Sequence, residues 1–326
     1  MPNPCLRIWC NLQFPPPADQ LLRSGVQPHQ ILPAINLQDS NLANGQPDSL
    51  LPTADIVFGQ IDPDALLNTP SIKWVHLTTA GYERYDRPDF RVALQQRRTI
   101  LTNSSAVYAE PCAQHILAMM LALARQLPRS LHNQAADRAW PAAPIRVSSH
   151  LLLGQTALII GFGSIARRLA ELLCPFHMTL SAVRRSPSGD EPIPTHTLAK
   201  LDCLLPSADH IINTLPGGPS TNKLVSASCF SLMKPSAIYY TVGRGSTTDQ
   251  DALLSALRCH KIAAAFLDVT TPEPLPPDHP LWTTPNCYIT PHTAGGQRDE
   301  PLAVVQHFLD NLHRFTANQP LRNRII

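Results

Sequence analysis

The chain carries little charge and no strong excess of either sign. Only 15% of its 326 residues are charged, against about 25% in an average globular protein. Its 26 basic and 24 acidic residues give a formal net charge of +2. The protein therefore has no strong positive electrostatic field that would attract nucleic acid or an anionic membrane surface, and we expect neither as a partner. Because 44% of the residues are hydrophobic, the chain should fold, into about two domains for its length.

The eight cysteines show no C-x-x-C pair and no Cys/His spacing suited to zinc. Scattered thiols of this kind are typical of a reducing compartment, so we predict a cytoplasmic protein with no metal site. The opening residues, MPNPCLRIWC, lack the basic and apolar segments of a secretory signal. The longest apolar run, residues 116–124, is far shorter than the roughly 20 residues of a membrane span.

The first hundred residues contain short apolar stretches separated by polar segments, which suggests alternating strands and helices. Residues 108–126 predict a long, almost uniformly apolar helix, buried against another domain or subunit. Residues 138–150 look like a connector, and residues from about 300 onward begin a further helix. No internal repeat is evident.

From residue 156 the pattern sharpens, because short apolar segments recur with room for a helix between them. Such spacing is typical of a parallel sheet with crossover helices. Residues 248–260 predict one of these helices, with Thr248 and Asp251 as an N-capping pair. The predicted strands are ALII, TLSAV, HIINT, AIYYTV, AAAFLDV and CYIT.

The first of these strands runs directly into the sequence GFGSIA and then into a helix, which is the context of a dinucleotide-binding turn. Gly161 would permit the tight turn, and Gly163 would let the backbone approach a pyrophosphate. The helix N-terminus would hold the phosphates through free N–H groups and the helix dipole. The predicted cofactor contacts in this turn are Gly161, Phe162, Gly163, Ser164 and Ile165.

The second strand should end about 20 residues after the glycines, where an acidic residue would bind a ribose 2′-hydroxyl. Here the sequence reads Arg184, Arg185 and Ser186. Two guanidinium groups and a hydroxyl would instead bind a 2′-phosphate. The sequence therefore predicts NADP (NADPH) as the cofactor, with NAD possible at lower preference. The alternative, that the two arginines are solvated charges at a strand end, stays open.

Three further segments follow predicted strands: TVGRGSTTD, LDVTTPEPLPPDHPLW and ITPHTAGG. Ligands of an open α/β sheet bind beyond the carboxyl ends of its strands, so these segments can share one cleft. They supply Arg244, Glu273 and His292, and we predict that these three residues are catalytic.

With these motifs the chain resembles the D-isomer-specific 2-hydroxyacid dehydrogenase family, and within it the glyoxylate/hydroxypyruvate reductases. The resemblance covers about residues 72–300 and is most specific from 156 onward. It implies an α/β fold with a Rossmann-type dinucleotide-binding domain, residues 103–293, inserted into a flavodoxin-like substrate domain of residues 1–102 and 294–326. It also implies a homodimer, formed through the apolar helix that begins near Tyr108.

The resemblance assigns roles to single residues. Arg244 would bind the substrate carboxylate and carbonyl, His292 would be the acid/base and Glu273 its partner. His292 would also contact both substrate and cofactor, and the backbone at Ala80 and Gly81 would hold the other side of the carboxylate. Further cofactor contacts are expected at Leu215, Pro216, Thr221, Val242, Gly243 and Asp268.

These roles suit the chemistry of reducing a 2-keto acid. The guanidinium fork of Arg244 matches a carboxylate next to a carbonyl. The alkoxide formed by hydride transfer needs a proton, and the His292 imidazolium can donate it near neutral pH. A carboxylate at Glu273 would raise the pKa of His292 and orient its ring.

We therefore predict an NADPH-dependent reductase of a small 2-keto acid such as glyoxylate, hydroxypyruvate or an aryl pyruvate, giving a D-2-hydroxy acid. Two alternatives stay open. One is a non-catalytic NAD(P)-sensing interaction protein that resembles the corepressors of this fold. The other is a narrower dehydrogenase of phosphoglycerate, formate or phosphite.

Overall fold

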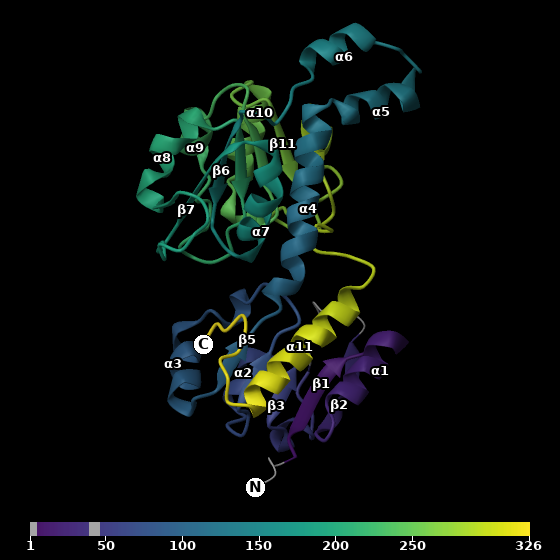
Figure 1. Ribbon diagram of the computed structural model, residues 1–326, viewed down its shortest axis with the longest axis vertical. Helices are drawn as coiled ribbons and strands as arrows, with labels where there is room; N and C mark the ends of the chain where they lie inside the picture. Colours follow the sequence, from purple (N-terminus) through teal and green to yellow (C-terminus); the bar gives the residue numbers. More distant parts are fainter. Residues whose placement is uncertain (1–4, 39–45) are drawn as a thin grey trace. The chain divides into compact units, whose positions relative to one another are not determined.

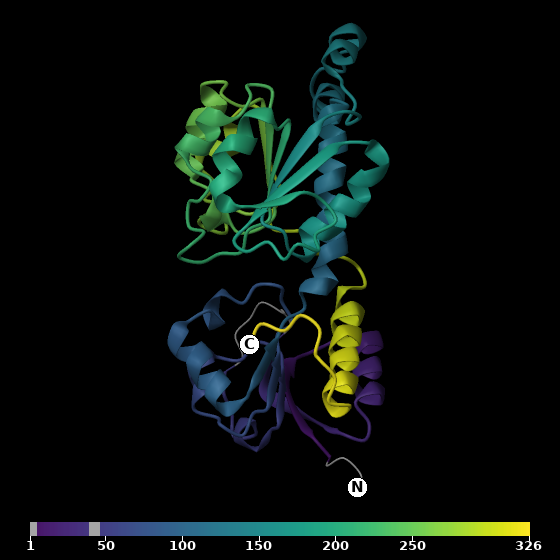
Figure 2. The same cartoon turned by 60° about the vertical axis from the view of Figure 1, so that its left-hand side comes forward.

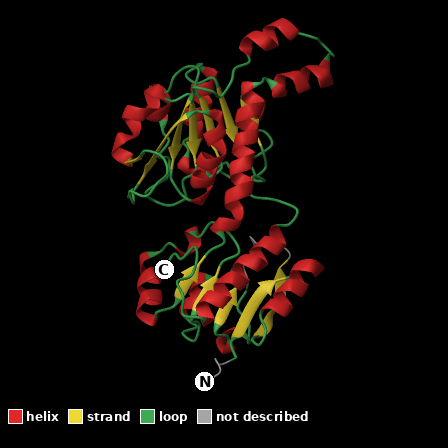
Figure 3. Cartoon of the chain, viewed as in Figure 1, coloured by secondary structure: helices red, strands yellow, loops and turns green. Residues whose placement is uncertain are grey.

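The computed structural model describes residues 5–38 and 46–326. It divides the chain into two compact units, the first formed by Met1–Tyr108 and Gly296–Ile326 and the second by Ala109–Gly295. Both units are built on parallel sheets with helices on either face, so the predicted α/β class is confirmed (Figure 3). The sequence of unit 2 interrupts that of unit 1, beginning within α4 (Ser105–Ala124) and ending before α11 (Glu300–Thr316).

The sheet of unit 1 has the strand order β2-β1-β3-β4-β5, and all of its neighbours are parallel. This is the flavodoxin-like order. The strands are β1 (Arg7–Leu12), β2 (Gln30–Gln38), β3 (Ile56–Phe58), β4 (Trp74–His76) and β5 (Ile100–Thr102).

Successive side chains of a strand point to opposite faces of the sheet, so unit 1 has a hydrophobic core on each face of its sheet. Ile8 and Cys10 of β1 pack on one face with α1 (Pro16–Gly25) and α11 (Glu300–Thr316). Trp9 packs on the opposite face, which α2 (Pro63–Leu67) and α3 (Pro88–Arg97) cover (Figure 1).

The sheet of unit 2 has seven parallel strands in the order β12-β11-β10-β9-β6-β7-β8. The direction of winding reverses between β6 and β9, so the topological switch point lies beside the turn that follows β6. The six predicted strands are present, and the short edge strand β8 is an addition. Their bounds are β6 (Thr156–Ile160), β7 (Thr179–Arg184), β8 (Thr195–Thr197), β9 (His210–Asn213), β10 (Ile238–Thr241), β11 (Ala264–Leu267) and β12 (Cys287–Ile289).

Helices cover both faces of this second sheet (Figure 2). One face carries α8 (Leu201–Leu204), α9 (Ala227–Leu232) and α10 (Gln250–Arg258), whose apolar residues join one core cluster with Ala265 and Leu267 of β11. The other face carries α4 (Ser105–Ala124) and α7 (Ser164–Leu173). On that face the ring of His115 from α4 lies 5.3 Å from that of Phe266.

Two local expectations are wrong. The expected connector at residues 138–150 contains a helix, α6 (Ala142–Ser148), which follows α5 (Leu127–Ala136). The N-cap of α10 is Asp249, whose carboxylate accepts a hydrogen bond from the Ala252 N–H. Thr248 is instead buried against the Tyr239 hydroxyl, 2.6 Å away. The 3-10 helices are Leu51–Thr53, Glu83–Tyr85, Cys174–Phe176, Leu198–Lys200, Leu205–Ser207, Gly245–Thr247 and Pro280–Thr283.

Helix α4 has 20 residues and a mean hydropathy of 1.2, and by length and composition it could cross a membrane. Its buried residues include Ile116 and Met120, and most of its other residues are partly buried. It also carries Glu110, which pairs with Arg168 of α7. Within α4 only Ala106, Gln114 and Ala118 are exposed, and the predicted packing of this helix against another domain or subunit stays a prediction.

Candidate active site

The turn after β6 requires glycine at its first position. Gly161 has φ +90°, a conformation that L side chains rarely adopt. A Cβ there would lie 3.2 Å from both the Leu215 side chain and Thr214 Oγ1. Gly163 then forms the N-cap of α7, with no atom within 4 Å of a Cβ position, so its backbone is open to a ligand.

The first turn of α7 follows directly, so Ser164 and Ile165 bring the N-terminal end of a helix, with the positive end of its dipole, to this point. Phe162 is buried beneath the turn, with the Arg167 guanidinium 5.8 Å from its ring centroid. A strand, a glycine turn and a helix N-terminus at the switch point of a doubly wound sheet fit the pyrophosphate of a dinucleotide.

The loops after β9 and β10 lie against this turn. Leu215 and Thr221 are buried, and Thr221 Oγ1 donates to the Pro216 carbonyl at 2.7 Å. Gly243 packs so closely on Leu215 that a Cβ would lie 2.3 Å from its carbonyl oxygen. Val242 is buried beside Gly243. The structure thus brings these predicted cofactor residues to one place.

The end of β7 carries the three residues predicted to choose between the cofactors. Arg184 is half-buried, whereas Arg185 and Ser186 are exposed. The Arg184 guanidinium donates to Glu191 Oε1 at 2.9 Å. This acidic partner has no counterpart in the sequence-based interpretation of the site.

The three predicted catalytic segments leave adjacent strands, β10, β11 and β12, at the same edge of the sheet. His292 Nδ1 and Glu273 Oε2 lie 2.8 Å apart, and Glu273 Oε1 accepts the Thr270 N–H at 2.9 Å. The predicted pair is therefore formed. Its side chains remain 42% exposed at His292 and 37% exposed at Glu273, so solvent reaches both.

The pair shifts both pKa values. The hydrogen bond that His292 donates to the Glu273 carboxylate raises the pKa of His292 against the effect of burial. Partial burial would raise the pKa of Glu273, but the hydrogen bonds from His292 and the Thr270 N–H lower it below its usual value. The charge of Arg244 acts on both groups in the direction that lowers the pKa, and Arg244 Nη1 donates to the Gly243 carbonyl at 2.8 Å. The site therefore favours an imidazolium backed by a carboxylate.

The turn that carries Arg244 is tied to the loop that carries Glu273. A Cβ at Gly245 would lie 1.9 Å from the Thr270 carbonyl oxygen, so only glycine allows this approach. Gln250 makes two hydrogen bonds with the Thr271 backbone, at 2.6 and 2.7 Å.

Asp268 is buried and organises the loop of His292. Its Oδ1 accepts from Thr290 Oγ1 at 2.6 Å and from the Thr293 N–H at 2.9 Å, while Oδ2 accepts from the Ala294 N–H at 3.0 Å. His115 Nε2 lies 3.3 Å from Thr290 Oγ1. No local pattern connects His115 to the site, because His115 lies on α4, far from His292 along the chain.

Asn213 was also missed. It is fully buried at the end of β9, and its Oδ1 accepts the Leu215 N–H of the cofactor loop at 3.1 Å. Its Nδ2 donates to Thr247 Oγ1, which donates in turn to the Arg244 carbonyl. One side chain thus joins the cofactor loop to the arginine turn.

Ala80 and Gly81 lie in unit 1, in the loop after β4. Asn103 Nδ2 donates to the Ala80 carbonyl at 2.6 Å, and Thr79 Oγ1 donates to the Gly81 carbonyl at 2.8 Å. These bonds fix the loop, and its role in binding substrate stays a prediction.

A dinucleotide cradle followed by an arginine and a histidine–carboxylate pair defines an oxidoreductase that uses a nicotinamide cofactor. Comparison with known proteins agrees. A family model described as "D-isomer specific 2-hydroxyacid dehydrogenase, NAD binding domain" matches residues 117–294. The chain belongs to the D-isomer specific 2-hydroxyacid dehydrogenase family and is an NAD(P)-dependent enzyme of that family.

Individual relatives cover most of the chain. A glyoxylate/hydroxypyruvate reductase B of Escherichia fergusonii is 32% identical over 261 residues, 78% of each chain. A family member of known structure from Aeromonas salmonicida is 32% identical, with a TM-score of 0.77 over 99% of both chains. An NADPH-dependent glyoxylate/hydroxypyruvate reductase from Sinorhizobium meliloti, solved with NADP and malonate, is 24% identical and shares the fold, with a TM-score of 0.73 over 99% of this chain and 97% of that one.

Proposed function

We propose that the protein reduces a small 2-keto acid with NADPH and releases a D-2-hydroxy acid. Glyoxylate and hydroxypyruvate are the first candidate substrates, because the relative from Escherichia fergusonii carries those names. An aryl pyruvate is a further candidate. The observation that carries the proposal is the His292–Glu273 contact of 2.8 Å, formed by loops that follow β12 and β11, the second of which packs on the turn that carries Arg244.

The cofactor, when bound, supplies a hydride to the carbonyl carbon. The chain's own residues do the rest. Arg244 binds the substrate carboxylate and polarises the carbonyl oxygen. His292 donates a proton from its ring to that oxygen, and this assistance contributes about 10²–10⁴ in rate. Glu273 keeps the ring protonated and holds its orientation through Nδ1, which leaves Nε2 as the donating atom. The Ala80–Gly81 backbone binds the other carboxylate oxygen.

The choice of NADPH rests on the end of β7. Arg184, Arg185 and Ser186 stand where an acidic residue would select NAD, and the exposed Arg185 and Ser186 are open to a 2′-phosphate. The Sinorhizobium meliloti reductase, which holds NADP, shares the fold. For the location we propose the cytoplasm, because all eight cysteines are free.

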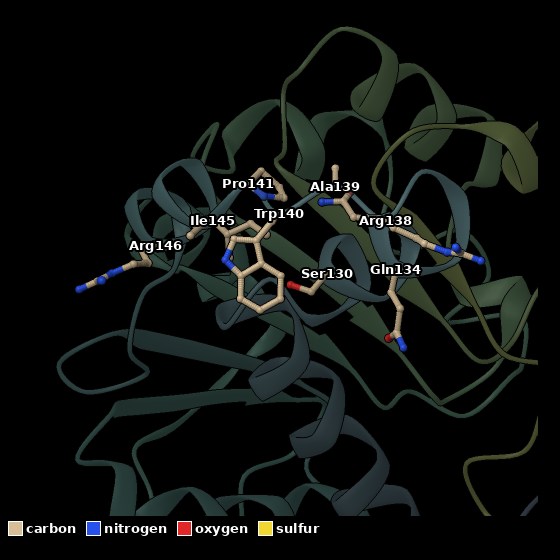
Figure 4. A pocket seen from close by; sticks show the side chains of 10 residues that line it. Ser130, Gln134, Arg138, Ala139, Trp140, Pro141, Ile145 and Arg146 are labelled. Atoms are coloured by element: carbon tan, nitrogen blue, oxygen red, sulfur yellow. The ribbon is translucent and has the colours of Figure 1, made fainter.

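We also propose a homodimer. Helix α4 is followed by α5 and α6, which extend from its end as an arm (Figure 1). On this arm Trp140 is 92% exposed and Val147 87% exposed. A groove of about 620 Å³ between the two helices is lined by Trp140, Pro141, Ile145 and neighbours (Figure 4). Exposed apolar surface of this extent favours contact with a second copy of the chain.

The decisive test is a turnover assay that follows the loss of NADPH or NADH absorbance with glyoxylate, hydroxypyruvate, phenylpyruvate and 3-phosphohydroxypyruvate. We expect turnover of a 2-keto acid and a higher kcat/KM with NADPH. Failure of the whole panel would favour the non-catalytic, cofactor-sensing alternative. Preference for the phosphorylated substrate would favour the phosphoglycerate alternative.

A further inference from the structure

The loop that carries His292 contains a left-handed turn. His292 has φ +53°, a backbone conformation that L side chains rarely adopt. Its N–H donates to the Asp268 carbonyl at 2.9 Å and to the Thr290 carbonyl at 3.0 Å. The next two N–H groups, those of Thr293 and Ala294, donate to the Asp268 carboxylate at 2.9 and 3.0 Å. The backbone and the side chain of Asp268 therefore hold the turn on which the position of the His292 ring depends.

The hydroxyl of Thr290 connects Asp268 to helix α4. Thr290 Oγ1 lies 2.6 Å from Asp268 Oδ1 and 3.3 Å from His115 Nε2. A hydroxyl has one proton and a carboxylate can only accept, so Thr290 donates its proton to Asp268. Thr290 Oγ1 must then accept from His115, which means that Nε2 of His115 carries a proton. The two hydrogen bonds thus run in one direction, from α4 to the carboxylate.

The surroundings of His115 fix its ring for this donation. The ring lies 5.3 Å from that of Phe266, which is on β11 two residues before Asp268. His115 Nε2 is also 3.9 Å from Asp268 Oδ1, so its N–H faces the carboxylate as well as the Thr290 hydroxyl. The Asp268 side chain is only 1% exposed, so protein groups must satisfy it. Without the His115 donor the hydroxyl is free to turn away, and the buried carboxylate loses a partner.

We propose that His115 is a positioning residue for the proton donor His292, acting through the hydrogen bonds that join α4 to Asp268. This inference rests on the proposed reduction of a 2-keto acid. His115 directs the Thr290 hydroxyl, and this hydroxyl completes the hydrogen bonds of the carboxylate that holds the turn. Proton transfer depends steeply on the position of the donor, whereas Arg244, which binds the substrate carboxylate, lies on a different turn. Loss of the His115 donor should therefore lower kcat and leave KM nearly unchanged.

The test measures kcat and KM with saturating NADPH in the full-length protein, for glyoxylate or whichever 2-keto acid of the panel is turned over fastest. His115→Leu keeps an apolar contact with Phe266 and removes the donor, so kcat should fall about three- to tenfold while KM stays within about twofold. His115→Gln restores an N–H donor and should recover most of kcat. His313→Leu is the matched control, because His313 is exposed on α11, and it should change neither constant.

Thr290→Val distinguishes an effect through Thr290 from a general disturbance of α4. Val has nearly the shape of Thr but no hydroxyl, so in a chain that carries Thr290→Val the further change His115→Leu should alter kcat by no more than about twofold. An unchanged kcat in His115→Leu, a KM that changes as much as kcat, no recovery in His115→Gln, or an equal loss in both backgrounds overturns the inference.

Urea unfolding of the same four proteins tests the contact without turnover. We expect the losses of stability from His115→Leu and Thr290→Val to be less than additive, because each change removes the same hydrogen bond. Additive losses would mean that the two side chains do not interact, and would overturn the inference. No turnover of any 2-keto acid by the unmodified protein contradicts the proposed function itself, and the positioning role fails with it even where the unfolding data show the contact.

Discussion

Replacing Glu273 by Gln tests how the carboxylate acts on His292. Gln has nearly the same shape and keeps an acceptor for the Thr270 N–H, but it carries no charge. A hydrogen bond to a charged group contributes about 1.5–3 kcal/mol of stabilisation when it is shielded from solvent. The side chains of this pair are 42% and 37% exposed, so we discount the contribution to about 1 kcal/mol, or roughly a fivefold loss of kcat at neutral pH.

The pH profile carries the stronger test. In the unmodified enzyme the contact with Glu273 raises the pKa of His292, so the proton donor persists to higher pH. Reduction should be fast below this pKa and should decline as the pH rises through it. In Glu273→Gln the pKa of His292 falls, so the declining limb of kcat moves to lower pH and the difference between the two enzymes widens with pH.

The assay is the initial rate of NADPH consumption with saturating glyoxylate between pH 5 and 9, with NADPH affinity measured separately by fluorescence. A declining limb that stays at the same pH in both enzymes, despite equal NADPH affinity, would refute the role given to Glu273. A uniform loss of kcat at every pH would indicate that the substitution only disturbs the loop.

Three further predictions concern the scaffold of the site. Gly245→Ala should destabilise the protein by about 1–3 kcal/mol, because its Cβ would lie 1.9 Å from the Thr270 carbonyl oxygen, and an unchanged urea midpoint would contradict this close contact. Asp249→Ala should lower the free energy of unfolding by about 1 kcal/mol through loss of the α10 N-cap, whereas no loss in urea unfolding would mean that the cap is not needed. Burial lowers the pKa of His210 to about 4, so the unfolded chain takes up the proton first and stability should fall as the pH drops from about 6.5 toward 4. His210→Gln should reduce this pH dependence in urea unfolding at pH 7 and pH 5, and an unaltered dependence would exclude His210 as its source.

The sequence predicts unit 2 well because its strands are buried on both faces. Runs such as ALII and HIINT are continuous and apolar, and they become β6 and β9. β8, with the sequence THT, lies at the sheet edge and carries no such signal. Thr248 seemed a fitting helix cap by residue type, but the buried hydroxyl of Tyr239 holds it, and Asp249 caps the helix instead. Tertiary contacts, which no local pattern shows, thus determine which of these two adjacent residues caps the helix.

The three residues proposed as catalytic could be predicted to lie at one edge of the sheet for a different reason. Arg244, Glu273 and His292 each follow a strand, and parallel strands bring such positions to one edge of the sheet. The sequence could not show which other side chains hold the loops of the site in place. Asn213 supports the arginine turn from β9, and Glu191 engages Arg184 from seven residues further along the chain. Both are polar side chains whose partners are chosen by the fold, so their roles emerge only from coordinates.

The central claim is that His292, backed by Glu273, supplies the proton for reduction of a 2-keto acid. The most direct test is kcat for glyoxylate reduction by His292→Ala, with NADPH affinity measured on the same preparation. We expect kcat to fall about 10²- to 10⁴-fold while NADPH binds as in the unmodified enzyme. Unchanged turnover in the variant would contradict the mechanism.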